Sequence, residues 1–254
     1  MKLQILGCSG GIGGGLRTTS MLLDHDVLID AGTGVGDLSL EALSKIDHVF
    51  LTHSHLDHIV SIPFMLDSVA SMRDKPLIIY ATEETLEALQ QHIFNWKIWP
   101  DFRQIPNPQQ PHMHYQVIVQ GETVVLNGRK ITPLPANHVI PAVGYQLDSG
   151  QFSLVYTGDT TTQNDFWDVV NRIDNLEYLI IETAFPDAER ELAVLSKHLC
   201  PSLLAEELEK LRLDPQIYIT HLKPDESEVT MHEISKFARA KPAKMLTNGH
   251  VFEF

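Results

Sequence analysis

The sequence has few cysteines and few basic residues. Its 254 residues include only two cysteines, Cys8 and Cys200, too few for a disulfide framework or for a zinc site built on cysteine. We expect both to be ordinary buried or half-buried thiols. The 19 lysines and arginines are outnumbered by 33 aspartates and glutamates, which gives a formal net charge of −14. Such an acidic chain lacks the cationic surface that nonspecific binding to nucleic acid or anionic membranes requires.

Long apolar segments are also missing. No run approaches the ~18 residues of a membrane-spanning helix, and no charged segment followed by a long apolar stretch opens the chain. We therefore expect a soluble, cytoplasmic protein. The composition, 43% hydrophobic and 20% charged, is that of a globular chain. With no linker and no internal repeat, we expect residues 1–254 to form a single domain with a sizeable core.

Histidine, in contrast, is abundant, with 13 residues. Three of them lie in the segment THSHLDH, residues 52–58, between an apolar strand-like segment and an apolar segment typical of a buried helix. His53 and His55 project to the same side of an extended backbone, and Asp57 and His58 follow at the turn. Imidazole nitrogens with a carboxylate suit zinc, iron or manganese better than calcium or magnesium. The segment therefore predicts a metal site rather than a solvated polar loop.

Further candidate ligands follow later predicted strands. His138, Asp159 and His221 each come at or just after the carboxyl end of an apolar, β-branched segment. Because strand ends on one side of a sheet converge in space, we expect these side chains to meet the histidine-rich segment. The candidate metal ligands are seven residues: His53, His55, Asp57, His58, His138, Asp159 and His221.

The order of the elements predicts an α/β (α+β) protein with two sheets face to face and helices outside. Strands are predicted at 3–6, 21–23, 27–29, 49–51, 77–80, 178–181 and 217–220, and two short strands are predicted near the end of the chain. Antiparallel strands with tight turns are predicted at 117–119, 124–126, 131–134, 143–147 and 152–156. Helices are predicted at 38–44, 83–92, 163–172, 203–208 and 233–238.

Some features have two interpretations. The glycine-rich segment 7–15 matches no nucleotide-binding fingerprint, so a flexible loop near the mouth of the site is favoured over a phosphate cradle. Asp30 either orients a ligand histidine or is a simple turn residue. The aromatic segment 94–102 either plugs a satellite core, which we favour, or stacks on a flat ligand. We expect His112 and His114 to be surface residues.

Together these residues resemble the metallo-β-lactamase superfamily, and the resemblance covers nearly the whole chain. It implies an αββα sandwich with a dinuclear metal site between the sheet edges. One ion would be held by His53, His55, His138 and Asp159. The second would be held by Asp57, His58, His221 and Asp159, with Asp159 bridging. The two divalent ions are expected to be zinc, with manganese or iron as alternatives.

Within the superfamily, residues 53–61 and 93–102 resemble the class II cyclic-nucleotide phosphodiesterases. The segment ETAF, residues 182–185, followed by His198 resembles the proton-shuttle pair of ribonuclease Z, which matures the 3′ ends of transfer RNA. Both families cleave phosphodiesters. The resemblance therefore implies a hydrolase that cleaves the 3′ phosphoester of 3′,5′-cyclic nucleotides, cAMP or cGMP, to 5′-nucleotides.

We hypothesise that a metal-bridging hydroxide attacks phosphorus in line with the 3′ oxygen. His198, oriented and kept charged by Glu182, would donate a proton to the departing oxygen. The catalytic candidates are thus Asp57, Glu182 and His198. Trp96, Trp99 and Phe102 are the candidates for the purine pocket.

Other functions stay open. Transfer RNA is not the favoured substrate, because lysine and arginine are scattered and residues 94–116 carry only Lys97 and Arg103. A ribonuclease Z-like endonuclease, another ester or thioester hydrolase, and a non-enzymatic metal-binding sensor are the alternatives. Dimers are common among such hydrolases, so a homodimer is open as well.

Overall fold

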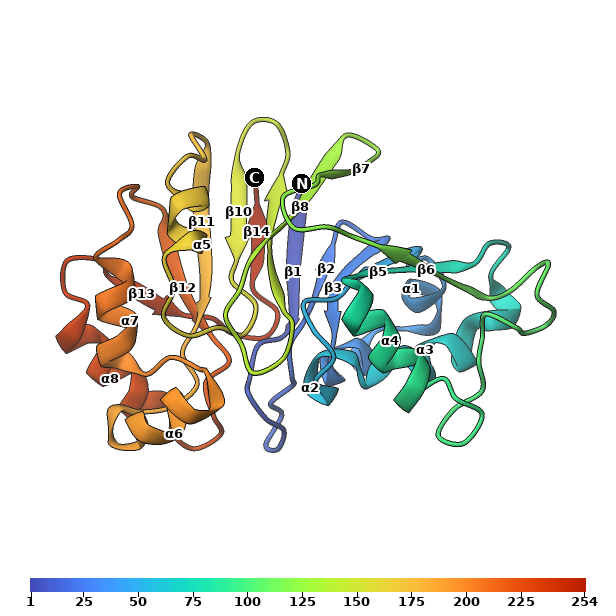
Figure 1. Ribbon diagram of the computed structural model, residues 1–254, viewed down its shortest axis with the longest axis horizontal. Helices are drawn as coiled ribbons and strands as arrows, with labels where there is room; N and C mark the ends of the chain where they lie inside the picture. Colours follow the sequence, from blue (N-terminus) through green and yellow to red (C-terminus); the bar gives the residue numbers. More distant parts are fainter.

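Two seven-stranded sheets form the centre of the protein, whose computed structural model describes residues 1–254 (Figure 1). The first sheet has the order β14 (Val251–Glu253), β1 (Lys2–Gly7), β2 (Ser20–Leu23), β3 (Val27–Ala31), β4 (His48–Phe50), β5 (Leu77–Ala81) and β6 (Met113–Val117). The second has the order β13 (Ala243–Met245), β12 (Gln216–Thr220), β11 (Leu176–Glu182), β10 (Ser153–Tyr156), β9 (Val143–Asp148), β8 (Arg129–Pro135) and β7 (Val124–Leu126).

Both sheets are mixed. In the first, β3 to β6 pair in parallel and the remaining pairs are antiparallel. In the second, β10 to β13 pair in parallel and β7 to β10 are antiparallel. Parallel neighbours need a crossover connection, which helices usually supply, whereas antiparallel neighbours need only a turn. The helices therefore accompany the parallel half of each sheet.

Helices cover the outer face of each sheet, as Figure 1 shows. Beside the first sheet lie α1 (Leu40–Ser44), α2 (Leu56–Ile59), α3 (Ser61–Val69) and α4 (Glu83–His92). Beside the second lie α5 (Asp165–Val170), α6 (Arg190–Ser196), α7 (Pro201–Leu208) and α8 (Ser227–Phe237). This arrangement confirms the predicted α/β class with two mixed sheets and helices outside.

Three apolar layers hold the sandwich together. One cluster of 22 buried residues joins the first sheet to its helices, another of 22 joins the second sheet to its helices, and a third of 21 lies between the sheets. Successive residues of a strand alternate between layers, because their side chains point to opposite faces. Val49 packs toward the helices and Phe50 toward the other sheet. Strands buried on both faces explain the continuous apolar runs in the sequence.

Some predicted elements differ from the structure. The strand expected at 117–119 is β6, which runs over 113–117 and pairs in parallel with β5 rather than with the antiparallel set. Its Val117 and the following Val119 are exposed, so their β-branched character was misleading. Helix α6 was not predicted, because its apolar residues, 192–195, are consecutive instead of spaced three or four apart. Of these four, only Ala193 is buried.

The aromatic segment 94–102 is divided between the core and the surface. Phe94 and Phe102 are 1% and 4% exposed and belong to the core beside the first sheet, as the plug interpretation predicted. Trp96 is 59% exposed. Trp99 packs edge-on against Phe64, with ring centroids 5.2 Å apart.

None of the helices has the length and apolar composition needed to cross a membrane.

A buried ion pair ties the two sheets together at the end opposite the histidine-rich segment. Arg129 of β8 donates from Nη2 to Asp26 Oδ2 at 2.8 Å and from Nη1 to Asp24 Oδ2 at 3.2 Å, and both aspartates lie in or beside the β2–β3 turn. Burial alone would raise the pKa of Asp26, but the hydrogen bond and charge of Arg129 outweigh it and lower the pKa. The stabilisation is therefore present at neutral pH and is lost as the pH falls through the lowered pKa.

Replacing Arg129 by methionine should lower the free energy of unfolding by about 3 kcal/mol, because Asp26 stays buried without its partner. Denaturant unfolding at pH 7 measures the change. The double variant Arg129→Met/Asp26→Asn should recover part of the loss, since it leaves no uncompensated charge. A single variant as stable as the wild type would contradict this role for the pair.

Candidate metal centre

The candidate ligands all come from the carboxyl ends of strands. The segment with His53 and His55 follows β4 directly, and Asp57 and His58 lie on the first turn of α2 rather than in an open loop. His138 follows β8, Asp159 follows β10 and His221 follows β12. Because the two sheets present these ends at the same edge, residues distant in sequence meet there.

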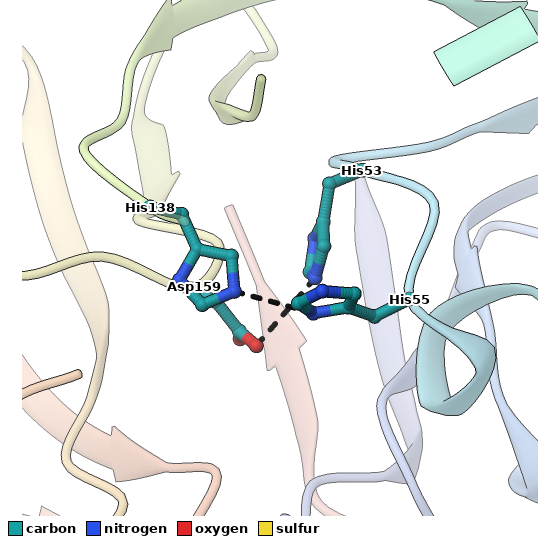
Figure 2. Close-up of side chains that lie close together, drawn as sticks. All are labelled: His53, His55, His138 and Asp159. Atoms are coloured by element: carbon teal, nitrogen blue, oxygen red, sulfur yellow. Dashed lines mark hydrogen bonds and ion pairs between the residues drawn. The ribbon is translucent and has the colours of Figure 1, made fainter. Parts of the chain in front are cut away.

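The structure brings all seven predicted residues together in two groups of four. In each group the potential ligand atoms lie within 4.8 Å of one another, and Asp159 belongs to both groups. One group is His53, His55, His138 and Asp159, which Figure 2 shows converging from both sides of the site; the other is Asp57, His58, Asp159 and His221. His55 and Asp57 are half-buried and the other five are buried.

Close contacts between side chains define the centre. His138 Nε2 lies 3.2 Å from His55 Nδ1. Asp159 Oδ2 lies 3.7 Å from His53 Nε2 and 3.3 Å from His58 Nε2, and Asp159 Oδ1 lies 3.4 Å from His221 Nδ1. A single carboxylate thus faces three imidazoles, two from the first sheet's side and one from the second's.

Four buried polar atoms at the centre have no hydrogen-bond partner: His53 Nε2, His58 Nε2, Asp159 Oδ1 and His221 Nδ1. An unpaired buried polar atom costs about 1–3 kcal/mol. Four such atoms that converge on one point are suited to share a positively charged partner. Imidazole nitrogens and a carboxylate oxygen are the donor set of divalent zinc, manganese or iron, so the residues present fit such a cation.

Burial keeps three of these histidines in the neutral form that binds a cation. Burial lowers the pKa of His138 to about 4 and that of His221 to about 3, despite the opposing charge of Asp159. Burial also lowers the pKa of His53 well below its ordinary value. At neutral pH these three imidazoles are neutral, which leaves a nitrogen lone pair for coordination.

Asp30 orients two of the histidines. Its Oδ2 accepts a hydrogen bond of 2.7 Å from His58 Nδ1, and its Oδ1 accepts one of 2.8 Å from the Thr52 backbone N–H. The Thr52 hydroxyl donates to Asp30 and lies 2.9 Å from His53 Nδ1. With both Nδ1 atoms engaged, the Nε2 atoms of His53 and His58 face the centre. Of the two interpretations of Asp30, the structure supports orientation of a candidate ligand.

Lys197 orients His138, and sequence reasoning missed it. The Lys197 carbonyl accepts a hydrogen bond of 3.1 Å from His138 Nδ1, which leaves Nε2 to face His55. Lys197 Nζ also donates to the His138 carbonyl at 3.0 Å and to Asn137 Oδ1 at 3.1 Å. Because the acceptor is a backbone carbonyl, no residue type in the sequence marks it. In the structure, the carbonyl belongs to a turn after α6 in which Lys197 has a left-handed conformation (φ 53°).

The predicted pair Glu182 and His198 lies beside both groups. His198 Nδ1 donates to Glu182 Oε1 at 2.7 Å, and the His198 ring lies 4.9 Å from the His138 ring and 5.2 Å from the His221 ring. Burial disfavours the charged imidazole, but the charge and hydrogen bond of Glu182 outweigh it and raise the pKa of His198. Backbone N–H groups of Thr160 and Leu199 fix the Glu182 carboxylate.

The glycine-rich segment closes one side of the centre. A Cβ atom on Gly10 would lie 2.6 Å from the His221 carbonyl and 3.1 Å from its ring, so the backbone approaches too closely for any other residue. This agrees with a loop at the mouth of the site. His114 is exposed on β6, as predicted, whereas His112 is half-buried. Both line a different cavity, outside the histidine-rich centre.

Comparisons with known proteins place the chain in a family. Residues 25–234 match the family model described as "Beta-lactamase superfamily domain". The chain is 26% identical over 204 residues to a "Probable 3',5'-cyclic-nucleotide phosphodiesterase" of Yersinia pestis, covering 71% of this chain and 58% of that protein. It is 28% identical over 167 residues to a "Ribonuclease Z" of Staphylococcus saprophyticus, covering 59% of this chain and 50% of that one. The chain thus spans only about half the length of these relatives.

Among solved structures, the "metallo-beta-lactamase fold protein YhfI" of Bacillus subtilis is similar with a TM-score of 0.78. The alignment covers 100% of this chain and 98% of that one at 20% identity. At this identity the similarity shows the fold alone, and that fold is the one the sequence predicted.

Removing Asp159 should empty the centre, because both groups share its carboxylate. We expect Asp159→Ala to lose metal that the wild-type protein retains after dialysis, measured by elemental analysis of the folded protein. His112→Ala, which alters a histidine outside the centre, should keep the wild-type content. An Asp159→Ala protein with its full complement of metal would refute the shared role.

Proposed function

The chain belongs to the β-lactamase superfamily, and on that premise we propose that it is a phosphodiesterase that hydrolyses the 3′ phosphoester of 3′,5′-cyclic nucleotides to 5′-nucleotides. Its fold and its cluster of histidines and aspartates are those of a metal-dependent hydrolase. The observation that carries the phosphodiesterase part of the proposal is the Glu182–His198 pair beside both ligand groups. The 3′ oxygen of ribose leaves as a strongly basic alkoxide, so its departure needs a proton donor.

In this proposal two divalent ions occupy the two groups. His53, His55, His138 and Asp159 would hold one, and Asp57, His58, His221 and Asp159 would hold the other. Ions bound there lower the pKa of a water molecule and offset the charge of the phosphoryl oxygens. The histidine-rich donor set favours zinc, with manganese or iron as alternatives.

In this proposal the protein itself contributes the proton donor, the charged imidazole of His198. His198 Nδ1 is engaged by Glu182, so Nε2 is the atom that donates to the departing 3′ oxygen. The buried Glu182 carboxylate stabilises the charged imidazole and fixes the plane of its ring. Asp57 is the half-buried carboxylate of the centre. In this proposal it helps to hold the second ion on the more exposed side of the centre.

A small anion suits this surface better than transfer RNA does. In the segment 94–116 Arg103 is already engaged, because it pairs with Asp101 at 2.8 Å and stacks on the Tyr115 ring at 4.6 Å. Only Lys97 is then left to contact a nucleic-acid backbone there, whereas RNA binding usually needs a basic patch. The name of the Yersinia pestis relative supports the cyclic-nucleotide proposal. Similarity to a ribonuclease Z keeps a transfer RNA endonuclease as the second candidate.

The metal-loaded protein should convert cAMP to 5′-AMP, and a chelator should stop the reaction. His198→Ala should keep the metal content and slow turnover by about 10²–10⁴-fold, the usual scale of general acid catalysis. Chromatographic measurement of 5′-AMP, with His112→Ala as a matched control, tests both statements. An unchanged rate in His198→Ala would remove this residue from the mechanism.

Absence of turnover with metal in place would contradict the cyclic-nucleotide proposal. Cleavage of precursor transfer RNA by the same preparation would then favour the endonuclease. Hydrolysis of a thioester or lactone would favour another ester hydrolase. A protein that cleaves none of these but binds metal reversibly would fit a sensor.

A further inference from the structure

A cavity of ≈ 410 Å³ lies beside His138, and the mechanism proposed above makes no use of it. The segment 136–143, which joins β8 to β9, forms one wall. Thr82, just before α4, and Gln120, after β6, also line the cavity. His138 reaches from this segment toward His53 and His55, so the cavity and the metal centre share one residue (Figure 2).

About half of the residues that line this cavity are apolar, and its walls carry no formal charge. Val139, Ile140 and Pro141 belong to the lining, which contains no carboxylate, lysine or arginine. In a chain with a net charge of −14 this is a neutral area. Small-molecule pockets of about 300–1,000 Å³ typically combine such walls with a few polar groups. The cavity therefore suits an uncharged part of a ligand whose anionic part lies at the metal centre.

Among the polar side chains that line the cavity, Gln120 is the one that forms no hydrogen bond at all within the protein. The Asn137 amide donates to the Thr162 carbonyl at 3.0 Å and accepts from Lys197 at 3.1 Å. The Thr82 hydroxyl donates to Thr85 Oγ1 at 3.2 Å. The exposed Gln120 side chain forms no hydrogen bond within the protein. Its amide is free to recognise a bound molecule.

We propose that this cavity takes the purine base of the substrate and that the Gln120 amide recognises the base edge. The inference rests on the proposed cyclic-nucleotide phosphodiesterase function. Adenine presents an N6 donor beside a ring-nitrogen acceptor, which a glutamine amide matches with two hydrogen bonds. Guanine presents the O6 acceptor beside the N1 donor, and the same amide matches it after a half-turn. Glutamine thus accommodates either purine.

This assignment differs from the purine pocket expected from the aromatic segment. Phe102 is 4% exposed within the core, and Trp96 and Trp99 do not line the cavity next to His138. The base would instead lie between the 136–143 segment and the amino end of α4.

Two variants of Gln120 test the proposal by their different effects on base recognition. Gln120→Leu keeps the size and removes the hydrogen bonds, so KM for cAMP and cGMP should rise about 10- to 100-fold while kcat stays near wild type. Cleavage of bis(p-nitrophenyl) phosphate, which has no purine, should not change. A carboxylate only accepts hydrogen bonds, so Gln120→Glu should shift kcat/KM toward cGMP, whose N1–H and amino group both donate, by about 10-fold.

The matched control is Gln116→Leu, which alters an exposed glutamine on β6 outside the cavity and should behave as wild type. If the wild type hydrolyses cyclic nucleotides and both Gln120 variants keep its KM and its base preference, the inference is wrong.

Failure of the proposed function is distinguishable from failure of this inference. If the metal-loaded wild type hydrolyses no cyclic nucleotide, calorimetric titration with 5′-AMP decides the base site alone. Weaker binding of 5′-AMP to Gln120→Leu than to the wild type and Gln116→Leu would support the cavity as the base site. Equal affinity in all three proteins, or no binding to the wild type, would overturn it.

Discussion

One buried carboxylate, that of Asp159, holds the centre together. It is 1% exposed and lies within 4 Å of three imidazoles, those of His53, His58 and His221. Burial alone would raise its pKa, but its interactions with the His221 and His58 imidazoles outweigh burial and lower the pKa well below the ordinary value. The carboxylate comes from the second sheet and two of the imidazoles from the first, so it stabilises the centre only when the sheets are correctly placed. The apolar layer between the sheets provides that placement.

The turn between α6 and α7 serves two parts of the centre with consecutive residues. Lys197 turns its carbonyl toward His138, and His198 turns its ring toward Glu182. The left-handed backbone of Lys197 permits this change of direction within one residue. Alignment of a candidate ligand and of a candidate proton donor therefore depends on the same short turn, although the two act on different atoms.

Sequence alone was sufficient for the fold class and for the identities of the clustered residues. The histidine-rich segment is recognisable because its ligands are close together in the sequence. His138, Asp159 and His221 are recognisable because each follows an apolar strand. The superfamily resemblance is confirmed by the family match. What the sequence could not predict depends on tertiary contacts. The cavity beside His138 combines Thr82, Gln120 and residues 136–143, which no periodicity connects. The role of Lys197 rests on a carbonyl, and the edge strand β6 has too few buried residues to show its register.

The separation of the clustered residues along the chain has a consequence for assembly. They extend from His53 to His221, and each group draws on both sheets, so no fragment containing one sheet has a complete set. Contacts of such long sequence separation form late in folding, because loop closure must precede them. Tight capture of an ion would accordingly report that both halves of the chain have been synthesised, folded and docked. The metal centre would thus act as a checkpoint for completeness, in which a truncated or half-folded chain fails to retain its ions.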